Sequence, residues 1–475
     1  MCLLTDHGRT TLRRMSDPLF PDVDPQPASD GRDDAPPRYE TANRDQIELQ
    51  PCDVESLLPP GHAARLVWRF VEGLDLSAFY ATIRAREGRA GRPPIDPKIL
   101  VALWLYATMD GVGSAREIDR LCDSHDAYRW LRGGVSVNYH TLSDFRVQHH
   151  AALDDLLTQS IAVLLQRGVV TMARVAHDGT RVRGSAGAGS FRRGDTLQEC
   201  LRQARKQVER TAKQTDAPVN AREAAAQQRA ATERVARVEE ALAQLPAVQA
   251  TKDRQQGKRP TEARVSTTDP DARVMKMADG GYRPAYNVQL ATDVDSRAVV
   301  GLAVTNLGSD RSSLMPMLTQ IQARTGQLPA AALVDGGCFT RETITEAAAL
   351  GAKVYAPLST RRGGPTAKPT RTDSPALREW RERMGTPEAQ QIYKARAATA
   401  EWVNGDARTH RTLNTIPVRG LQKVHTWALW IALAHNMVRT LEIVPHLMTY
   451  PVTGRSPDAH PSLSPAAPRP TRGFD

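Results

Sequence analysis

The spacing of apolar residues divides the chain into a helical part and a part in which short strands alternate with helices. From about residue 57 to residue 165, apolar positions recur three or four residues apart, as on the face shared by Leu66, Phe70 and Leu74. This period is typical of amphipathic helices. We therefore predict an all-α N-terminal domain over residues 51–165.

A capping signal separates two of these predicted helices. Pro97 suits the first turn of one helix, and the break at Gly111 and Gly113 ends it. Ser114 and Glu117 then form a capping box for the next helix. Helix, tight glycine turn, helix is typical both of a DNA-reading helix-turn-helix and of a plain packing hairpin. The pattern leaves both interpretations open.

The hydrophobic pattern changes at Gly168. The run from Val169 to Ala176 is short and rich in β-branched residues, which predicts a buried strand. Further strands are predicted at 286–292, 298–305, 331–334 and 353–356, with helices at 314–321, 341–350 and 421–438. Strands alternating with helices predict an α/β domain with a mixed sheet over residues 166–441.

Three segments fall outside this α/β pattern. Residues 196–245 return to helical spacing around a turn at 216–220, which predicts a helical hairpin inserted at about 195–262. Residues 1–50 are rich in Asp, Pro and Arg, and residues 442–475 are rich in proline. Low hydrophobicity with many prolines is typical of disorder, so both tails are predicted to be disordered.

The charge of the chain adds a possible partner. Lys and Arg number 63 against 53 Asp and Glu, a net charge of +10. Residues 361–423 hold thirteen of the basic and six of the acidic residues. Such a local excess favours a polyanionic partner, although a solvated basic face has the same composition.

Cysteine usage and hydropathy place the protein in the cytoplasm. The five cysteines are scattered and form no Cys-x-x-Cys pair, so neither a disulfide framework nor a zinc site is expected. No run approaches the roughly 20 apolar residues of a membrane span. We expect a soluble cytoplasmic protein with no membrane partner.

Two apolar runs end in an aspartate that precedes glycine, at Asp178 and at Asp335. By itself Asp-Gly is most often a turn. Side chains at strand ends of one α/β sheet, however, gather at one edge, and two carboxylates brought together repel unless a cation joins them. Magnesium prefers such oxygen ligands. Glu401 lies among arginines on a predicted helix, where spacing alone favours a surface ion pair.

These segments, taken in order, resemble a bacterial insertion-sequence transposase of the DDE class. The resemblance spans residues 55–441 and rests on Thr141-Leu-Ser-Asp-Phe-Arg146, Ala176-His-Asp178-Gly-Thr-Arg, Thr268-Asp-Pro-Asp-Ala-Arg, Gly281-Tyr-Arg-Pro-Ala-Tyr286-Asn-Val-Gln, Leu333-Val-Asp335-Gly-Gly, Tyr393-x-x-Arg396, Glu401-Trp-Val-Asn and Val418-Arg-Gly-Leu-Gln-Lys423. It implies a ribonuclease H-like catalytic core and a metal-binding triad of Asp178, Asp335 and Glu401.

The resemblance also implies residues that contact DNA. Tyr393 and Arg396 match the pair that precedes the glutamate in related transposases, although here the glutamate follows Arg396 by one residue more than usual. Arg408 stands where a lysine is common. Arg419 and Lys423 of the last motif are further candidates for contact with the DNA backbone. Independently of the resemblance, Arg181, Arg183, Arg192 and Arg193 surround the glycine-rich stretch 184–189, which could approach a DNA backbone or be a flexible linker.

The activity implied is cleavage of DNA at the ends of a mobile element, followed by attack of the freed 3′ hydroxyl on target DNA. The cofactor is expected to be Mg²⁺, with Mn²⁺ as a substitute. Double-stranded DNA and further copies of the chain are the expected partners, since two ends must be paired, and the protein would associate with the nucleoid. A non-catalytic DNA-binding descendant of a transposase and a metal-dependent nuclease are the alternatives.

Overall fold

The computed structural model describes residues 3–6, 9–12, 53–85, 93–213, 221–255, 262–358 and 368–443. The chain divides into two units, residues 1–51 and 52–475. In the first unit, β1 (Leu3–Asp6) pairs antiparallel with β2 (Arg9–Leu12). The sequence analysis predicted no strand in residues 1–50. From residue 444 on, the predicted proline-rich tail lies outside the described residues.

The second unit begins with a helical region, as the apolar spacing predicts. Its helices are α1 (Ala63–Glu72), α2 (Ser77–Tyr80), α3 (Pro97–Met109), α4 (Ala115–Ser124), α5 (Asp126–Arg132), α6 (Tyr139–Gln148) and α7 (His150–Gln166). Pro97 opens α3 after the cap Asp96, as predicted. Of the predicted capping box, the structure shows one half: the Ser114 hydroxyl accepts the Glu117 N–H at the start of α4, while the Glu117 carboxylate pairs with Arg120. Nearly all of α3 is buried, so it is a core helix.

A six-stranded mixed sheet follows the helices. Its strands are β3 (Arg174–Arg183), β6 (Arg273–Lys276), β7 (Tyr282–Asp293), β8 (Val299–Thr305), β9 (Ala331–Val334) and β10 (Lys353–Tyr355). The order is β10-β9-β3-β7-β6, and β8 also pairs with β7. Strands β10, β9 and β3 are parallel, whereas β7 is antiparallel to β3, β6 and β8. The predicted mixed α/β architecture is confirmed.

The first strand differs from its prediction. The sequence predicts a strand from Val169 to Ala176, but β3 runs from Arg174 to Arg183 and carries Asp178 in its middle. The strand continues because Thr180 and Val182 are buried and the backbone pairs with β7 throughout. Because polar and apolar residues alternate in this strand, it does not form the continuous apolar run from which the sequence analysis predicted strands. The short pair β4 (Phe191–Arg192) and β5 (Val265–Ser266) was likewise not predicted.

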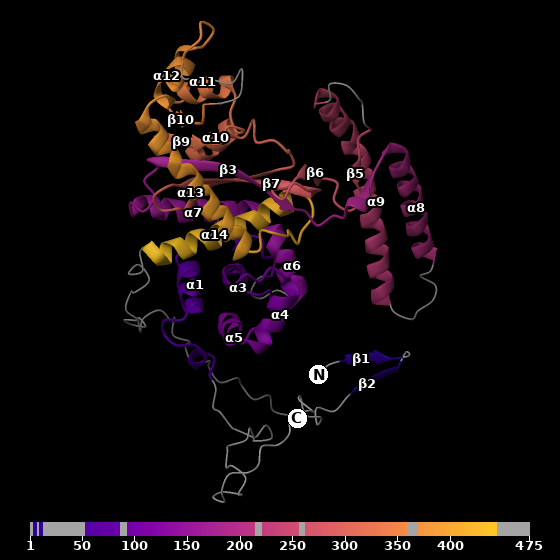
Figure 1. The fold of residues 1–475 in the computed structure, drawn as a ribbon. Coiled ribbons are helices and arrows are strands. Elements are labelled where there is room, and N and C mark those ends of the chain that lie inside the picture. The colour runs from indigo at the N-terminus through magenta and orange to yellow at the C-terminus, as the bar shows by residue number, and fades with distance from the viewer. Residues whose placement is uncertain are drawn as a thin grey trace, which may run out of the picture. The chain divides into compact units, whose positions relative to one another are not determined.

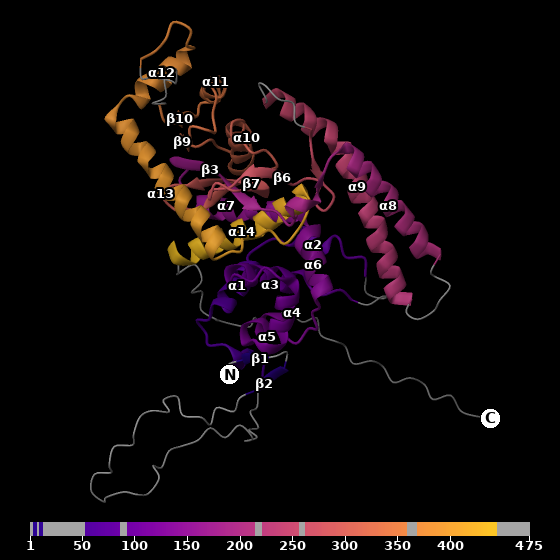
Figure 2. The same cartoon turned by 45° about the vertical axis from the view of Figure 1, so that its right-hand side comes forward.

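The other helices are α8 (Gly194–Lys213), α9 (Ala221–Gln255), α10 (Leu314–Thr325), α11 (Arg341–Ala349), α12 (Pro375–Met384), α13 (Pro387–Thr409) and α14 (Leu421–Ile443). The two helices of the insertion, α8 and α9, lie side by side in both views (Figures 1 and 2). Helix α9 continues through Pro246 to Gln255 and is thus longer than the predicted hairpin helix. No helix among the described residues is long and apolar enough to cross a membrane.

Helix α14 joins the helical region to the sheet. It packs against α3, α6 and α7 on one side and against β8 on the other. The ring centroid of Trp104 in α3 lies 6.0 Å from that of Trp427 and 6.3 Å from that of Trp430. Towards the sheet, the Asn436 amide accepts the Val299 N–H at 2.7 Å and donates to the Val299 carbonyl at 2.8 Å. The helical region and strands β3, β7 and β8 therefore share one hydrophobic core, while β9 and β10 belong to a second one with α11 and α12.

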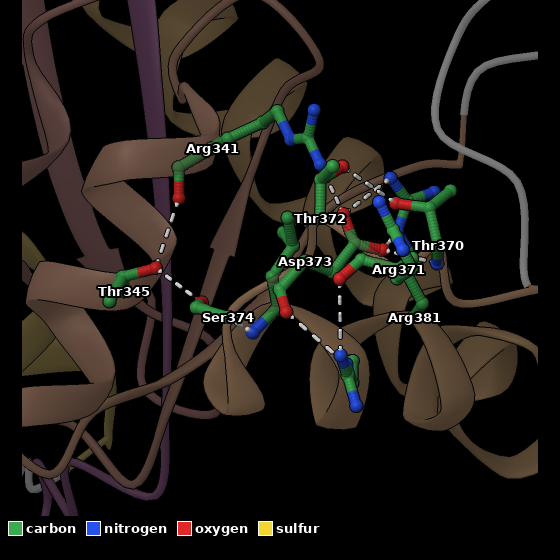
Figure 3. A network of polar contacts seen from close by, with 10 residues as sticks. Arg341, Thr345, Thr370, Arg371, Thr372, Asp373, Ser374 and Arg381 are labelled. Carbon is green, nitrogen blue, oxygen red and sulfur yellow. Dashed lines mark hydrogen bonds and ion pairs between the residues drawn. The ribbon is translucent and has the colours of Figure 1, made fainter.

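A buried aspartate fastens α12 to α11. The Asp373 side chain is fully buried and accepts hydrogen bonds from the Arg341 guanidinium, from the Thr370 N–H at 2.8 Å and from Arg381 Nη2 at 3.5 Å (Figure 3). Arg381 Nε lies 2.8 Å from Asp373 Oδ2 in an ion pair. Burial opposes the charge of this carboxylate, but the Thr370 and arginine contacts outweigh it and lower the pKa of Asp373 to about 2. Arg341 and Arg381 are thus paired with a buried carboxylate of the chain itself.

Candidate active site

The sheet register places Asp178 and Asp335 next to each other. Parallel strands β3 and β9 are in register up to His177 and Val334. Asp178 and Asp335 are the next residues of their strands, and neighbouring strands lie about 4.8 Å apart. Asp335 follows the end of β9, where the Cys338 N–H closes a turn on the Asp335 carbonyl at 3.0 Å. One of the two Asp-Gly pairs is thus a turn and the other is strand.

Arg396 lies between the two carboxylates. Its Nη1 is 3.3 Å from Asp178 Oδ1, and its Nη2 is 3.2 Å from Asp335 Oδ1. The Arg396 side chain is 15% exposed, that of Asp178 25% and that of Asp335 53%. Among the polar contacts of the described residues, this guanidinium is the only group that touches both aspartates.

Helix α13 brings Arg396 to the sheet. Thr386 caps its first turn, Pro387 opens it, and the helix packs across β3, β7, β9 and β10. Asn404, two turns after Arg396, donates from Nδ2 to Asp178 Oδ2 at 3.3 Å. The oxygen of this amide, Asn404 Oδ1, is buried without a hydrogen-bond partner among the described residues.

Glu401 lies on α13 between Arg396 and Asn404, with an exposed side chain. No hydrogen bond or ion pair of the described residues joins it to Asp178 or Asp335. Within the same described ranges, no three His, Cys, Asp or Glu side chains are grouped as a metal site would require. The structure therefore brings the two aspartates together and leaves the glutamate on the neighbouring helix surface.

The electrostatics of the pair depend on burial. Burial, assisted by the charge of Asp335, outweighs the attraction of Arg396 and raises the pKa of Asp178 above its usual range. Burial also opposes the charge on Arg396, but Asp178, Tyr393 and Asp335 outweigh it and raise the pKa of Arg396. A carboxylate whose ionised form is disfavoured gains from an added positive charge.

A polar cluster supports β3 from the other face of the sheet. Asp310 Oδ1 accepts from Gln289 Nε2 and, at 2.6 Å, from Asn287 Nδ2. A methyl group added at Gly179 would lie 2.3 Å from Asp310 Oδ1 and 2.2 Å from Gln289 Nε2. Gly179 is therefore required for close approach and not for a turn. The signal in the sequence was the polar alternation of Asn287 and Gln289 inside an apolar strand.

Several of the predicted DNA contacts meet in one cleft of about 200 Å³. Arg181, Arg183 and Arg408 line it together with Arg283, which the sequence analysis did not single out. Arg408 donates to the Thr180 hydroxyl and, at 2.9 Å, to the Arg181 carbonyl. Arg181 donates to the Gly308 carbonyl at 2.9 Å. Of the three predicted arginines, Arg183 has the most exposed position.

The remaining predicted contacts lie elsewhere in the fold. Arg192 and Arg193 are exposed next to α8, and Arg193 Nε lies 3.3 Å from Glu262 Oε2. Arg419 donates to the Ser185 carbonyl at 3.1 Å, and Lys423 is exposed in the first turn of α14. Tyr393 is half-buried, and burial raises its pKa.

The Thr268-Asp-Pro-Asp segment has a structural role. Asp269 is fully buried and accepts the Tyr286 hydroxyl at 2.7 Å and the Gly420 N–H at 3.1 Å. Asp271 accepts the Leu421 N–H at 2.8 Å. Both carboxylates therefore cap the start of α14, where helix N–H groups have no partner within the helix.

Comparison with known protein families identifies the class. A family described as a transposase domain (DUF772) matches residues 52–148, and one described as a transposase DDE domain matches residues 360–441. No curated protein and no solved structure matches the chain. The matches cover the helical N-terminal region and the segment that carries Arg396 and Glu401. Together they support an insertion-sequence DDE transposase and confirm the resemblance found in the sequence.

Proposed function

We propose that this protein is a transposase that cleaves DNA at the ends of an insertion sequence and joins them to a target, with Asp178, Asp335 and Glu401 as the catalytic carboxylates. The observation that carries the proposal is the contact of both aspartates with one guanidinium, that of Arg396. A ribonuclease H-like core is part of the proposal. It is supported by the order β8-β7-β3-β9-β10, in which β7 is antiparallel to β3 and β8 while β9 and β10 run parallel to β3.

The donor set around Asp178 suits Mg²⁺. Asp178 and Asp335 supply carboxylate oxygens, and Asn404 Oδ1 is a buried oxygen without a partner among the described residues. Hard divalent cations prefer such oxygen ligands and keep several waters. When bound, a divalent cation supplies Lewis-acid activation of the attacking oxygen and stabilises the leaving one. We assign Glu401 as the third carboxylate because it shares α13 with Arg396 and Asn404.

The other residues of the site bind and position the substrate. Arg396 holds the two carboxylates together and can contact a phosphate when it leaves them, since guanidinium matches phosphate geometry. Arg183 and Arg283 face the neighbouring cleft, where they would neutralise the DNA backbone. Arg192, Arg193, Arg419 and Lys423 would extend this contact, and paired element ends would require at least two copies of the chain. The domain limits 51–165 and 166–441 remain part of the proposal.

The test is strand cleavage and joining of a duplex that carries the element end, with Mg²⁺ or Mn²⁺. Wild type is compared with Asp178→Asn, Asp335→Asn and Glu401→Gln, each of which keeps the shape of the side chain. Glu388→Gln is the matched control, because Glu388 lies exposed on the same helix α13 away from the aspartates. We expect the three site variants to lose both steps and the control to retain them.

The products separate the alternatives. Cleavage without joining would identify a metal-dependent nuclease. Binding of the duplex without either reaction in wild type would identify a non-catalytic DNA-binding protein. Full activity in any one of the three site variants would contradict the role assigned to that residue.

A further inference from the structure

Besides the cleft lined by Arg181, Arg183 and Arg408, a second cleft borders the loop that follows α13. It has a volume of about 560 Å³ and is bordered by the start of α4, by α6 and by residues 412–417. This volume is within the range of small-molecule binding sites and exceeds that of a single ion. None of the predicted active-site residues lines the cleft.

The walls of the cleft hold buried hydrogen-bond donors that have no partner in the described part of the chain. Trp427 is 0% exposed and Arg146 is 8% exposed, yet Trp427 Nε1 and Arg146 Nε have no acceptor among the described residues. The Thr412 hydroxyl beside them is also buried and unpaired. A buried donor without a partner is unfavourable, so it indicates a group that is bound there in the working state.

The charge of the cleft is positive. The first residues of α4, Ala115 and Arg116, border it, and a helix start carries partial positive charge. Arg116 at the rim lies over the Tyr139 ring at 5.1 Å. Arg146 stays charged at neutral pH, because burial lowers its pKa only to about 10. Asp144 at the rim is the one carboxylate among the described lining residues.

The free groups select the ligand by its chemistry. Indole N–H and guanidinium N–H can only donate, so their partner must be an acceptor. Phosphate offers acceptor oxygens and negative charge, which the helix start and the two arginines favour. The rings of Tyr139 and His140, which contact each other with centroids 4.0 Å apart, border the same cleft, and aromatic rings can stack on nucleotide bases.

We propose that this cleft binds a nucleotide unit of a DNA strand through its phosphate, held by Trp427 Nε1, Arg146 Nε and the start of α4. The identity of the strand as DNA rests on the proposed function. The inference assigns the N-terminal region a contact with one phosphate that is independent of the metal-binding carboxylates.

The test measures DNA binding by fluorescence anisotropy, with the full chain, labelled duplex and single-stranded oligonucleotides, and EDTA to prevent catalysis. Trp427→Phe removes the donor and keeps the ring, and Arg116→Ala changes only an exposed side chain. Arg120→Ala is the matched control, because Arg120 lies exposed on the same helix, pairs with Glu117 and does not line the cleft.

We expect Trp427→Phe and Arg116→Ala each to raise the Kd about 3- to 10-fold, and Arg116→Ala to lower the salt slope by about one. Arg120→Ala should stay within about 2-fold of wild type. Thermal unfolding of each variant shows whether Trp427→Phe still folds; if it does not, Arg116→Ala decides alone. Binding of Arg116→Ala with wild-type Kd and salt slope would overturn the inference.

A second readout separates this inference from the proposed function. Inorganic pyrophosphate should raise the unfolding temperature of wild type, and less so that of Arg116→Ala. Equal binding of DNA by wild type and both cleft variants overturns the cleft and leaves the transposase proposal intact. If wild type binds no DNA, both proposals fail, and protection by pyrophosphate would then identify a site for a free phosphate compound.

Discussion

Asp178 and Asp373 both meet arginine side chains, but the two environments differ in how completely they satisfy the carboxylate. Asp373 is fully buried, with two guanidinium groups and a backbone N–H as fixed donors, and its pKa is lowered to about 2. Asp178 is partly exposed, its contacts to Arg396 and Asn404 are 3.3 Å long, and burial raises its pKa.

The difference distinguishes Asp373, a carboxylate that stabilises the fold, from Asp178, a carboxylate that can still bind a cation. Two guanidinium groups and a backbone N–H already bind Asp373, so its charge stabilises the contact of α11 with α12. Asp178 carries an ionised form that its surroundings disfavour, next to a second carboxylate. Such a group gains from a cation, and sites that are unfavourable for stability are often the functional ones.

The largest expected effect is on activity at the less satisfied aspartate. Asp178→Asn should lower the rate of strand cleavage at least about 10³-fold, because a catalytic ligand is lost while the shape is kept. Its unfolding temperature should equal or exceed that of wild type, since the disfavoured charge is removed. Gel-based cleavage and thermal unfolding measure the two. If Asp178→Asn lost cleavage but also unfolded many degrees below wild type, Asp178 would be a structural carboxylate like Asp373, and the distinction would be contradicted.

The corresponding substitution at Asp373 should lower the stability of the protein. Asp373→Asn leaves the guanidinium groups of Arg341 and Arg381 without their shared acceptor, so the unfolding temperature should fall by several degrees. Glu379→Gln, on the exposed surface of α12, should have little effect by comparison. Differential scanning calorimetry measures both variants. An unchanged unfolding temperature for Asp373→Asn would remove the distinction between the two aspartates.

Gly179 tests the support beneath Asp178. Gly179→Ala places a methyl group against Gln289 and Asp310, and such overpacking typically costs about 1–3 kcal/mol. Gly187→Ala is the control, because nothing lies within 4 Å of an added methyl group there. Denaturant unfolding gives the free energies. If both variants unfold at the same denaturant concentration, the close approach at Gly179 has no energetic weight.

The two aspartates should also respond to pH with opposite signs. The lowered pKa of Asp373 means that its stabilisation is present above pH 4 and is lost as the pH falls towards 2. The raised pKa of Asp178 means that wild type loses stability relative to Asp178→Asn as the pH rises through that pKa. Unfolding temperatures measured across pH for wild type and both variants test this. If the unfolding temperatures of Asp178→Asn and Asp373→Asn changed with pH in the same way, the predicted difference between the two aspartates would be contradicted.

The smallest effect is expected at the cleft beside the active site. Arg183→Ala removes one exposed cation, which should weaken DNA binding a few-fold and lower the salt slope by about one. Arg129→Ala on α5, where Arg129 pairs with Asp126, is the control. Anisotropy titrations at several salt concentrations measure both. Equal slopes for the two variants would place the DNA backbone elsewhere.

The prediction from sequence succeeded where signals are local. Pro97 in the first turn of α3, the cap at Ser114, the helices of the insertion and the strand that ends before Asp335 depend on neighbours in the chain. It was wrong for the extent of β3, because polar residues in that strand are satisfied by partners more than a hundred residues away, as His177 is by Gln289. Part of the basic excess, which the sequence assigned to a polyanionic partner or a solvated face, is internal, since Arg381, Arg396 and Arg411 pair with aspartates of the chain.

By itself the sequence determined the helical region, the mixed sheet and the set of acidic and basic residues that resemble a DDE transposase. These follow from short-range spacing and from an ordered set of motifs. Only the tertiary structure decided that Asp178 and Asp335 are neighbours in register, that Arg396 joins them, and that unpaired donors from α6 and α14 meet in one cleft. Such contacts depend on strand pairing and helix packing between distant segments, and local spacing carries no information about which distant segments will meet.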